Sequence, residues 1–385
     1  MKIDAWRAVR RFLEEERARS ASAPVYGREL HRLKMARMGV SSFAFLRGSA
    51  RLFYDIVART PSLLGTTDES GWIVGDLHVE NFGAFRTGSG DDVVFDVNDF
   101  DDAAHGPRRL DLLRITTSLL LAAPLFGFRG RAALDLGEAL LHGYADGVAP
   151  RKRPPAPIAR LLDRVRGRSR AELLARRTEV HHGKRRFVRG ERYLELPARL
   201  RKLVPDAFDE YLKSARLDPK SDEHAIVDVA FRIAGTGSLG ALRIAVLTRG
   251  KGGRDGNWLF DLKEERRSAC ALALDPSKRR HVVEAIDACL HRPPIALGRS
   301  RIDGIALIGR RLAPQEDKLA LGTVKPYELA DVVPYLGGTV RKLHARSGKP
   351  ARLDGRAIGR LLDDAVVLAG VHESAHLALA RMAER

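Results

Sequence analysis

Acidic and amide side chains are concentrated in one short stretch of the sequence, between apolar runs. The stretch reads IVGDLHVENFGAF and, a few residues later, VVFDVNDFDDAAHGPRRLDLLR. Its residues with metal-binding or proton-transferring side chains are Asp76, His78, Glu80, Asn81, Asp96, Asn98, Asp99, Asp101, Asp102 and Asp111. Carboxylates this close repel one another unless water or a cation relieves them. Hard oxygen ligands favour Mg²⁺ or Mn²⁺ over zinc, so we predict a divalent-metal site. The alternative is a pair of solvated hairpins, because Asp and Asn are also favoured turn residues.

The spacing within this stretch is more specific than its composition. Asp76 and Asn81 stand five positions apart after an apolar run, in a GDxHxxN pattern, and an Asp-Phe pair at Asp99 follows one hairpin later. Phosphoryl transfer needs a carboxylate that orients the acceptor hydroxyl. It also needs an amide oxygen and a second carboxylate that hold Mg²⁺ against the nucleotide phosphates. The pattern is therefore typical of a phosphotransferase that uses ATP and Mg²⁺.

A glycine cluster more than 100 residues downstream is a second candidate region. Gly235, Gly237, Ser238 and Gly240 lie in GTGSLG between two β-like runs, and the next such run carries Lys263. In dinucleotide-binding folds these glycines open a helix, whereas here the strand-like ALRIAVLTRG follows them. The order strand, glycine loop, strand and lysine-bearing strand is that of kinases, in which the loop and the lysine bind phosphates. We predict nucleotide binding here; a plain hairpin with a surface lysine is the alternative.

A carboxylate from the next helix is expected to pair with Lys263. Glu284, in RRHVVEAIDACL, is the candidate. Glu264 and Glu265 are sequence neighbours of the lysine and point elsewhere on a strand. The predicted nucleotide contacts therefore include Glu284 as well as the glycine cluster and the lysine.

The same motifs resemble those of a known enzyme group. GDLHVENFG and VNDFDDAAHGPRRLDLLR are similar to the catalytic and metal-binding loops of aminoglycoside and choline phosphotransferases. The longer series from FAFLRGSA to the terminal LHARSG resembles an uncharacterised bacterial family, the domain of unknown function 2252, over most of the chain. The resemblance implies that Asp76 is the catalytic base and that Asn81 and Asp99 are metal ligands. It also implies that Asp111 braces the catalytic loop by hydrogen-bonding its backbone.

The order of the motifs predicts an unusual fold. In ordinary kinases the glycine loop precedes the catalytic loop, and here it follows. Near the C-terminus, VVPYLGGTVRKLHARSG resembles the helix that leads into the catalytic loop of small-molecule kinases. A circular permutation explains both facts, because permutation is tolerated where termini lie close together. We expect an α+β, two-lobed, protein-kinase-like fold. Its large helical lobe is expected at 1–225, with 158–225 mostly helical, its small antiparallel lobe at 226–325, and C-terminal helices at 326–385.

Composition narrows the class of protein. The chain has 385 residues, of which 44% are hydrophobic, so it can bury a large core. Its two cysteines, Cys270 and Cys289, form no CxxC motif, which argues against a disulfide scaffold or a cysteine zinc site. The charged N-terminus has no signal-peptide core, and the longest apolar run, 119–126, is too short to span a bilayer. We expect a cytoplasmic protein without a membrane partner.

Several functional alternatives stay open at this point. The net charge of +18 permits nucleic-acid binding, although no RNP, zinc-finger or basic-zipper pattern is present. The same loops, with the nucleotide reversed, would transfer AMP instead of phosphate. A two-metal phosphoesterase would need further histidine ligands, such as a GNH motif, that the sequence lacks. A non-catalytic nucleotide- or nucleic-acid-binding protein is the remaining class. The sequence does not identify the hydroxyl acceptor, small molecule or protein, or choose between ATP and GTP.

Overall fold

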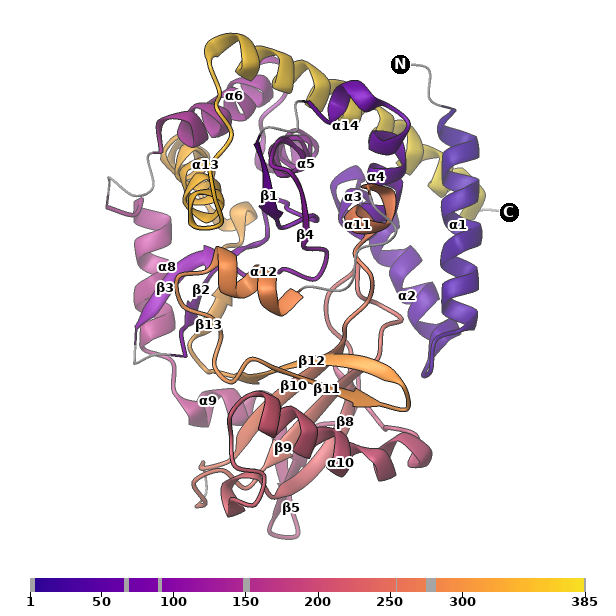
Figure 1. Cartoon of the computed structure of the whole chain (residues 1–385), viewed down its shortest axis with the longest axis vertical. Helices are drawn as coiled ribbons and strands as arrows, with labels where there is room; N and C mark the ends of the chain where they lie inside the picture. Colours follow the sequence, from indigo (N-terminus) through magenta and orange to yellow (C-terminus); the bar gives the residue numbers. More distant parts are fainter. Residues whose placement is uncertain are drawn as a thin grey trace.

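The computed structural model describes residues 4–65, 69–88, 92–147, 153–253, 255–274 and 282–383. Groups of helices and antiparallel strands confirm the predicted α+β class. Figure 1 shows two parts of the molecule. A mostly helical body contains the elements before residue 167, those between residues 269 and 290, and those after residue 315. A sheet body contains the remaining elements.

The helical body is assembled from both ends of the chain. Its helices are α1 (Ala5–Ala21), α2 (Gly27–Gly39), α3 (Ser42–Gly48), α4 (Ala50–Ala58), α5 (Arg109–Ala122), α6 (Arg131–Asp146), α8 (Ala156–Arg166), α11 (Ala269–Leu274), α12 (Val282–Cys289), α13 (Leu329–Arg346) and α14 (Gly355–Ala383). Strand β1 (Ser70–Ile73) pairs with β4 (Ala104–Pro107), and β2 (Phe82–Arg86) pairs with β3 (Val93–Val97) and β13 (Glu316–Lys318). The 3₁₀ helices in this body are η1 (Pro61–Leu63), η3 (Ala123–Phe126), η5 (Leu321–Thr323) and η6 (Pro326–Glu328).

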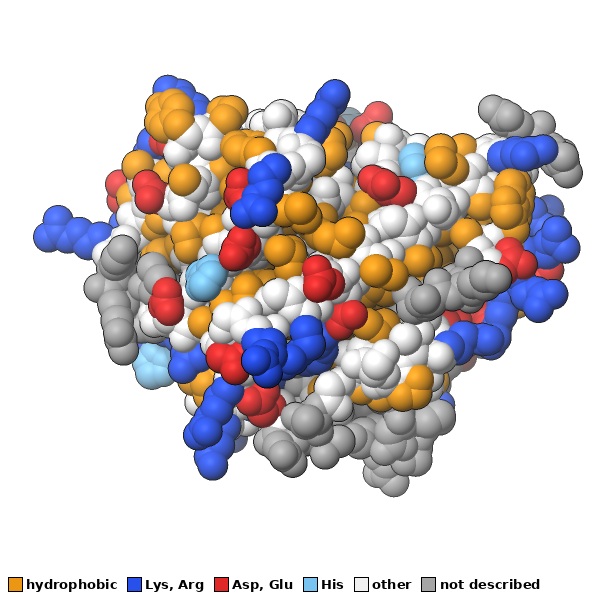
Figure 2. All heavy atoms as spheres, turned by 90° about the horizontal axis from the view of Figure 1, so that it is seen from above, with side chains coloured by type: hydrophobic (Ala, Val, Ile, Leu, Met, Phe, Trp, Pro, Cys, Tyr) orange, Lys and Arg blue, Asp and Glu red, His pale blue; other side chains and the backbone are white. Residues whose placement is uncertain are grey.

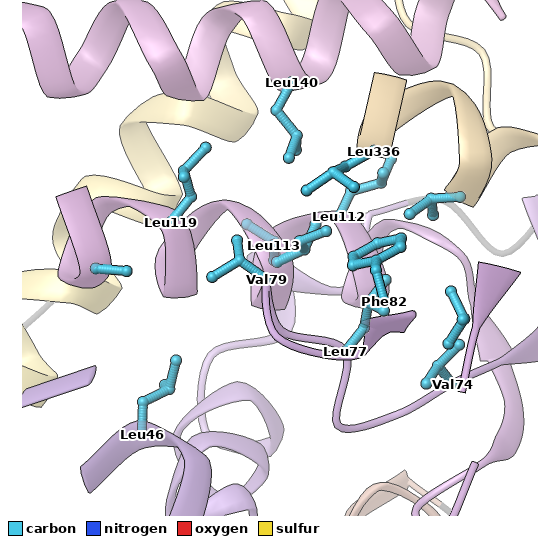
Figure 3. Packing of buried hydrophobic residues seen from close by; sticks show 14 of the residues in the cluster. Leu46, Val74, Leu77, Val79, Phe82, Leu112, Leu113, Leu119, Leu140 and Leu336 are labelled. Atoms are coloured by element: carbon cyan, nitrogen blue, oxygen red, sulfur yellow. The ribbon is translucent and has the colours of Figure 1, made fainter. Parts of the chain in front are cut away.

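Helix α5 lies at the centre of the helical body. Its sequence, RLDLLRITTSLLLA, is buried on almost every side, as expected for a helix enclosed by others. Figure 3 shows Leu112 and Leu113 of α5 close to Leu77 and Phe82, which come from the segment between β1 and β2 and from β2 itself. Polar residues of α5, Asp111 among them, are therefore carried into the core beside that segment.

The sheet body is built on a six-stranded antiparallel sheet in the order β11-β12-β10-β9-β8-β7. The strands are β7 (Tyr193–Leu194), β8 (Ile226–Arg232), β9 (Arg243–Thr248), β10 (Trp258–Glu264), β11 (Gly298–Ile302) and β12 (Ile305–Leu312). Helix α10 (Ala198–Ser214), helix α9 (Arg170–Ala175), the hairpin of β5 (Thr178–His181) with β6 (Lys184–Phe187), and η4 (Asp222–His224) complete this body.

The two faces of this sheet bury alternate residues of its central strands, β8, β9 and β10. Ile244 and Val246 of β9 share a core with Phe208 of α10, whereas Ala245 and Leu247 belong to the core on the opposite face. This alternation follows from the period of two in a strand. It explains why these strands read as continuous apolar runs in the sequence.

The hairpin of β5 and β6 is a part of 158–225 that differs from the predicted helical character, whereas α8, α9 and α10 in the same stretch are helices. The two strands are joined by His182 and Gly183, whose φ angles are 48° and 75°. Two successive positive φ angles match the twist of a tight hairpin and exclude a helix. The strand residues TEVH and KRRF are charged and largely exposed, so the stretch lacks the apolar alternation that usually identifies strands.

Candidate active site

A cleft of about 470 Å³ lies between the helical body and the sheet body. That volume is within the usual range for small-molecule sites. The predicted site residues that line it are Asp76, Asn81 and Asp99 from the helical body, and Gly235, Gly237, Ser238 and Lys263 from the sheet body. Gly240 lines a small adjoining cavity together with Ser238 and Lys263. The structure therefore brings together groups that are far apart in the sequence.

The segment Val74–Asn81, here called the GDLH segment, is hydrogen-bonded through its backbone to the buried carboxylate of Asp111. The backbone N–H of Val74 donates to Oδ2 of Asp111 at 2.8 Å, and that of Gly75 donates to Oδ1 at 3.0 Å. Nε2 of His344, in the last turn of α13, lies 3.1 Å from the same Oδ2 atom. The predicted brace by Asp111 is confirmed.

Further contacts leave the GDLH segment little freedom. The Tyr54 hydroxyl donates to the carbonyl of Gly75, and the N–H of Val79 donates to the Ser118 hydroxyl at 3.1 Å. Gly75 has a φ of +80°, and a Cβ atom there would lie 1.9 Å from the carbonyl oxygen of Asp102. Only glycine satisfies both conditions. Leu77 is buried in the core, whereas its polar neighbours Asp76 and His78 line the cleft.

Asp76 is paired with a buried arginine. Nε of Arg114 donates to Oδ1 of Asp76 at 2.9 Å, and the same guanidinium lies 4.7 Å from the centre of the Phe53 ring. Burial raises the pKa of Asp76 to about 7, because the lowering by Arg114 is outweighed and the nearby charges of Asp102 and Asp99 add to the increase. A carboxylate with this pKa accepts and releases a proton near neutral pH, as a general base must.

Asn81 has an unsatisfied buried oxygen. Its Nδ2 donates to the backbone carbonyl of Asp76 at 2.8 Å, which orients the amide group. Its Oδ1 is buried without a hydrogen-bond partner among the described residues. An unpaired buried carbonyl oxygen costs free energy, and a cation relieves that cost. This oxygen therefore fits the predicted role of Asn81 as a metal ligand.

Asp99 has the charge that a metal ligand requires. Burial alone would raise the pKa of Asp99, but the ammonium groups of Lys263 and Lys318 outweigh it and lower the pKa below its ordinary value. Among the described residues no three His, Cys, Asp or Glu side chains are grouped as a metal site. Mg²⁺ held by Asn81 and Asp99 would take its remaining ligands from phosphate oxygens and water, which is the usual arrangement for this ion.

The glycine loop, residues 233–242, connects strands β8 and β9. Gly235 and Gly240 have φ angles of +75° and +87°, in the left-handed region that favours glycine. A Cβ atom on Gly237 would lie 3.2 Å from the carbonyl oxygen of Arg47, so the loop approaches the helical body closely. Strand β10 pairs with β9 and carries Lys263 opposite Arg243, next to this loop.

The predicted partner of Lys263 is wrong. The ammonium group of Lys263 pairs with the carboxylate of Asp101, and the charge of Asp99 also acts on it. Glu284 instead binds Arg299 of β11, with 3.0 Å between Oε1 and Nη1. The physical reason is that the buried face of α12 is apolar, which leaves Glu284 on the outer face of that helix.

His78 lines the cleft in its neutral form. Burial lowers the pKa of His78 well below its ordinary value, and the nearby positive charge of Arg47 acts in the same direction. Its Nδ1 atom accepts the backbone N–H of Glu80 at 3.2 Å. The ring therefore supports the local turn.

A second cavity of about 240 Å³ adjoins the cleft. It shares Asp99, Gly235, Ser238, Lys263 and Lys318 with the cleft. The rest of its lining combines apolar side chains, from Phe85, Val97, Ile286, Leu290 and Leu297, with charged ones, from Arg232, Arg243, Asp261, Arg310 and Glu316. Two adjoining chambers therefore meet at one charged junction.

Lys318 is a site residue that the sequence analysis missed. It lies on β13, opposite Gly83 of β2, and lines both chambers. Its side chain has no hydrogen-bond or ion-pair partner among the described residues. A three-residue strand inside the charged stretch APQEDKLA carries no recognisable motif, so only the fold reveals this position.

Comparison with known families finds a match, and it covers the part of the chain that contains these motifs. Residues 28–381 match a family described as an uncharacterized protein conserved in bacteria, DUF2252. The chain belongs to this family. No curated protein and no solved structure matches the chain. The DUF2252 match includes every predicted site residue, whereas α1 lies before it.

The surface adds two observations about partners. In the described part of the chain, no helix has the length and apolar character needed to cross a bilayer. Figure 2 shows that acidic, basic and hydrophobic side chains are interspersed on the face seen from above. The net charge of +18 is not gathered into one basic patch on that face.

Proposed function

We propose that this DUF2252 protein is an ATP- and Mg²⁺-dependent phosphotransferase with a kinase-like, circularly permuted organisation. The observation that carries the proposal is the convergence of two motif groups on one cleft. Asp76, Asn81 and Asp99 line it from one side, and the glycine loop and Lys263 line it from the other. More than 100 residues separate the groups in the sequence, so no local turn explains their meeting.

The proposed reaction assigns one role to each group. Asp76 accepts the proton of the acceptor hydroxyl while that oxygen bonds to the γ-phosphorus and the bond from this phosphorus to the β–γ bridging oxygen breaks, so ADP leaves. Asn81 and Asp99 would hold Mg²⁺, which neutralises charge on the phosphates. Lys263 and the backbone of the glycine loop hold the phosphates in line.

The two chambers suggest how the nucleotide lies. The phosphates would occupy the junction, because Asp99, Lys263 and Lys318 are there. The base would pack against the apolar side chains of the second cavity, such as Phe85 and Leu290, which directs the γ-phosphate toward Asp76 and favours phosphoryl transfer. AMP transfer would instead need the base in the larger cleft. The acceptor would fill the part of the cleft beside Asp76.

The end of α13 supports the permuted arrangement. In the proposed fold this helix corresponds to the one that leads directly into the catalytic loop. His344 lies against Asp111, the brace of the GDLH segment, and Nη1 of Arg346 donates to Oδ2 of Asp96 on β3 at 2.7 Å. Residues near position 345 therefore bond to the carboxylate that braces the GDLH segment and to a strand that follows this segment, which is consistent with the proposed permutation.

Titration calorimetry with ATP in the presence and absence of Mg²⁺ tests the proposal. We expect Mg²⁺-dependent binding that weakens by at least about tenfold in both Asp99→Asn and Lys263→Ala. Glu284→Gln is a matched control, because this carboxylate lies outside the cleft. Absence of binding to either ATP or GTP, or binding indifferent to both cleft substitutions, would contradict the proposal.

The reaction products distinguish phosphoryl transfer from AMP transfer. Incubation with ATP and Mg²⁺ should release ADP if phosphate is transferred, and pyrophosphate if AMP is transferred. We expect ADP, and its formation should require Asp76. Pyrophosphate without ADP would replace phosphoryl transfer with nucleotidyl transfer on the same site.

A further inference from the structure

The N-terminal hairpin, residues 5–39, connects the two bodies across the cleft. Phe12 of α1 and Met38 of α2 are buried in the main core of the helical body. Val25 and Leu30 are buried in a core of the sheet body, together with residues of β8 and β9. One short supersecondary unit is therefore anchored in both cores.

A buried ion pair fixes the two helices of the hairpin relative to each other. Nζ of Lys34 lies 2.6 Å from Oε2 of Glu16, and Nη1 of Arg19 lies 2.9 Å from Oε1 of the same residue. Glu16 and Lys34 both line the cleft. A buried ion pair contributes little net stability compared with an apolar contact, but it restricts how two elements fit together. The hairpin thus has a defined geometry at the wall of the cleft.

The turn of the hairpin is anchored on the sheet body by a strained residue. Tyr26 has a φ of 53°, which is rare for a bulky side chain and is maintained only by its surroundings. Its hydroxyl donates to the carbonyl of Glu195 at 2.8 Å, and its ring packs edge to face on Phe231 of β8 with 5.5 Å between centres. Strand β8 leads directly into the glycine loop.

Arg37 of α2 contacts the glycine loop itself. Its Nη1 atom donates to the carbonyl of Gly235 at 2.6 Å. In a trans peptide the carbonyl and the following N–H point in opposite directions. The N–H of Thr236 therefore points away from Arg37, and Thr236 lines the cleft. That N–H has no acceptor among the described residues, so it is available for a phosphate oxygen.

We infer that the N-terminal hairpin sets the position of the glycine loop, and that Arg37 is the positioning residue that orients the Gly235–Thr236 peptide for phosphate binding. The inference rests on the proposed function. The glycines at 235 and 240 leave this backbone intrinsically free, so an external contact must select one conformation. Arg37 supplies that contact from an element anchored in both bodies.

Nucleotide affinities of matched variants test the inference. Arg37→Ala should weaken MgATP binding by about three- to tenfold, because one charge-assisted hydrogen bond to the loop is lost. Adenosine has no phosphates, so its affinity should not change. Arg37→Lys should recover part of the loss. Arg32→Ala, an exposed position on the same helix, should leave both affinities unchanged. Equal losses for ATP and adenosine, or no loss for either, overturn the inference.

Hydrogen exchange of the nucleotide-free protein separates this inference from the proposed function. Amides of residues 235–240 should exchange faster in Arg37→Ala than in the wild type or in Arg32→Ala. Unchanged exchange overturns the positioning role. A wild type that binds no MgATP overturns the proposed function, and the exchange comparison then still decides whether the hairpin positions the loop.

Discussion

The GDLH segment and the glycine loop line the same cleft, but different kinds of contact hold them in place. The GDLH segment is bonded to Asp111, Tyr54 and Ser118, which are all buried in the helical body. The glycine loop is bonded through its carbonyls to two arginines, Arg37 and Arg266, which are partly exposed. One backbone is fixed by the core, and the other by groups at the edge of the cleft.

This difference matches what each region has to do in the proposed reaction. A catalytic base must lie within a few tenths of an ångström of its productive position, and buried hydrogen bonds achieve this. A loop over a nucleotide must let it enter and leave, so it is drawn from the less stable parts of a fold. The comparison therefore predicts that substitutions around the GDLH segment affect catalysis and stability strongly, and that those around the glycine loop affect affinity.

The largest expected effect is that of Asp76→Asn on turnover. Asparagine keeps an oxygen for Arg114 but cannot accept the hydroxyl proton, so the rate should fall by about 10²- to 10⁴-fold. MgATP affinity should change by less than about threefold, because Asp76 is not assigned to the phosphates. Steady-state ADP release and calorimetry measure the two quantities. A variant that keeps more than about a tenth of the rate would remove Asp76 from the role of base.

Asp111→Ala should cause the largest loss of stability. The substitution leaves the N–H groups of Val74 and Gly75 and the ring of His344 without their buried partner. The free energy of unfolding should fall by about 3–5 kcal/mol, measured by urea titration. Ser238→Ala, in the glycine loop, should cost less than about 1 kcal/mol, because its hydroxyl makes one partly buried bond to Ala234. Equal losses for both variants would break the comparison between the two regions.

The pH dependence of the reaction should follow Asp76. Because burial raises its pKa to about 7, the base form is lost as the pH falls through that value. The ratio kcat/KM should drop by about tenfold per pH unit below pH 7. For stability the sign is opposite: a raised pKa favours the protonated folded state, so this contribution is present at low pH and is lost as the pH rises toward 7.

Asp76→Asn provides the control for both pH effects. The variant should lose the dependence of unfolding free energy on pH between about 4 and 7 that Asp76 contributes. Urea titrations at several pH values measure that difference. A wild-type kcat/KM that stays level from pH 5 to pH 8 would contradict the assignment.

The sequence predicts the GDLH segment better than its surroundings, and the reasons are physical. Asp76, Asn81 and Asp99 stand out because they have a characteristic spacing along the sequence, and the resemblance to a known family implied the brace by Asp111. The partner of Lys263 depends instead on how distant elements pack. Carboxylates are present both on α12, at Glu284, and in the loop after β3, at Asp101. Only the tertiary packing determines that Asp101 pairs with Lys263.

The sequence does not predict the hairpin of β5 and β6 or the role of the N-terminal hairpin, for related reasons. Exposed charged strands carry no apolar alternation, so β5 and β6 resemble a charged helical stretch. Arg37 is one of many arginines, and nothing in its neighbours indicates that it reaches the carbonyl of Gly235, nearly 200 residues away. Contacts between distant segments become visible only in the fold.

Lys318 provides a further test of the comparison between the GDLH segment and the glycine loop, because it lies in neither of them. It is a cation that lines both chambers of the site, and β13 fixes its backbone against β2 beside Gly83. If the phosphates occupy the junction, Lys318→Met should weaken MgATP binding by about tenfold and leave AMP binding within about twofold. Lys318→Arg, which keeps the charge, should retain most of the affinity for ATP.

The ratio of the two affinities is the informative quantity. A loss that is equal for ATP and AMP would place Lys318 near the base or the α-phosphate, and would argue for the reversed nucleotide and AMP transfer. No loss for either ligand would move the phosphates away from the junction. The glycine loop would then have to hold them alone, and Arg37→Ala should become the more damaging of the two substitutions.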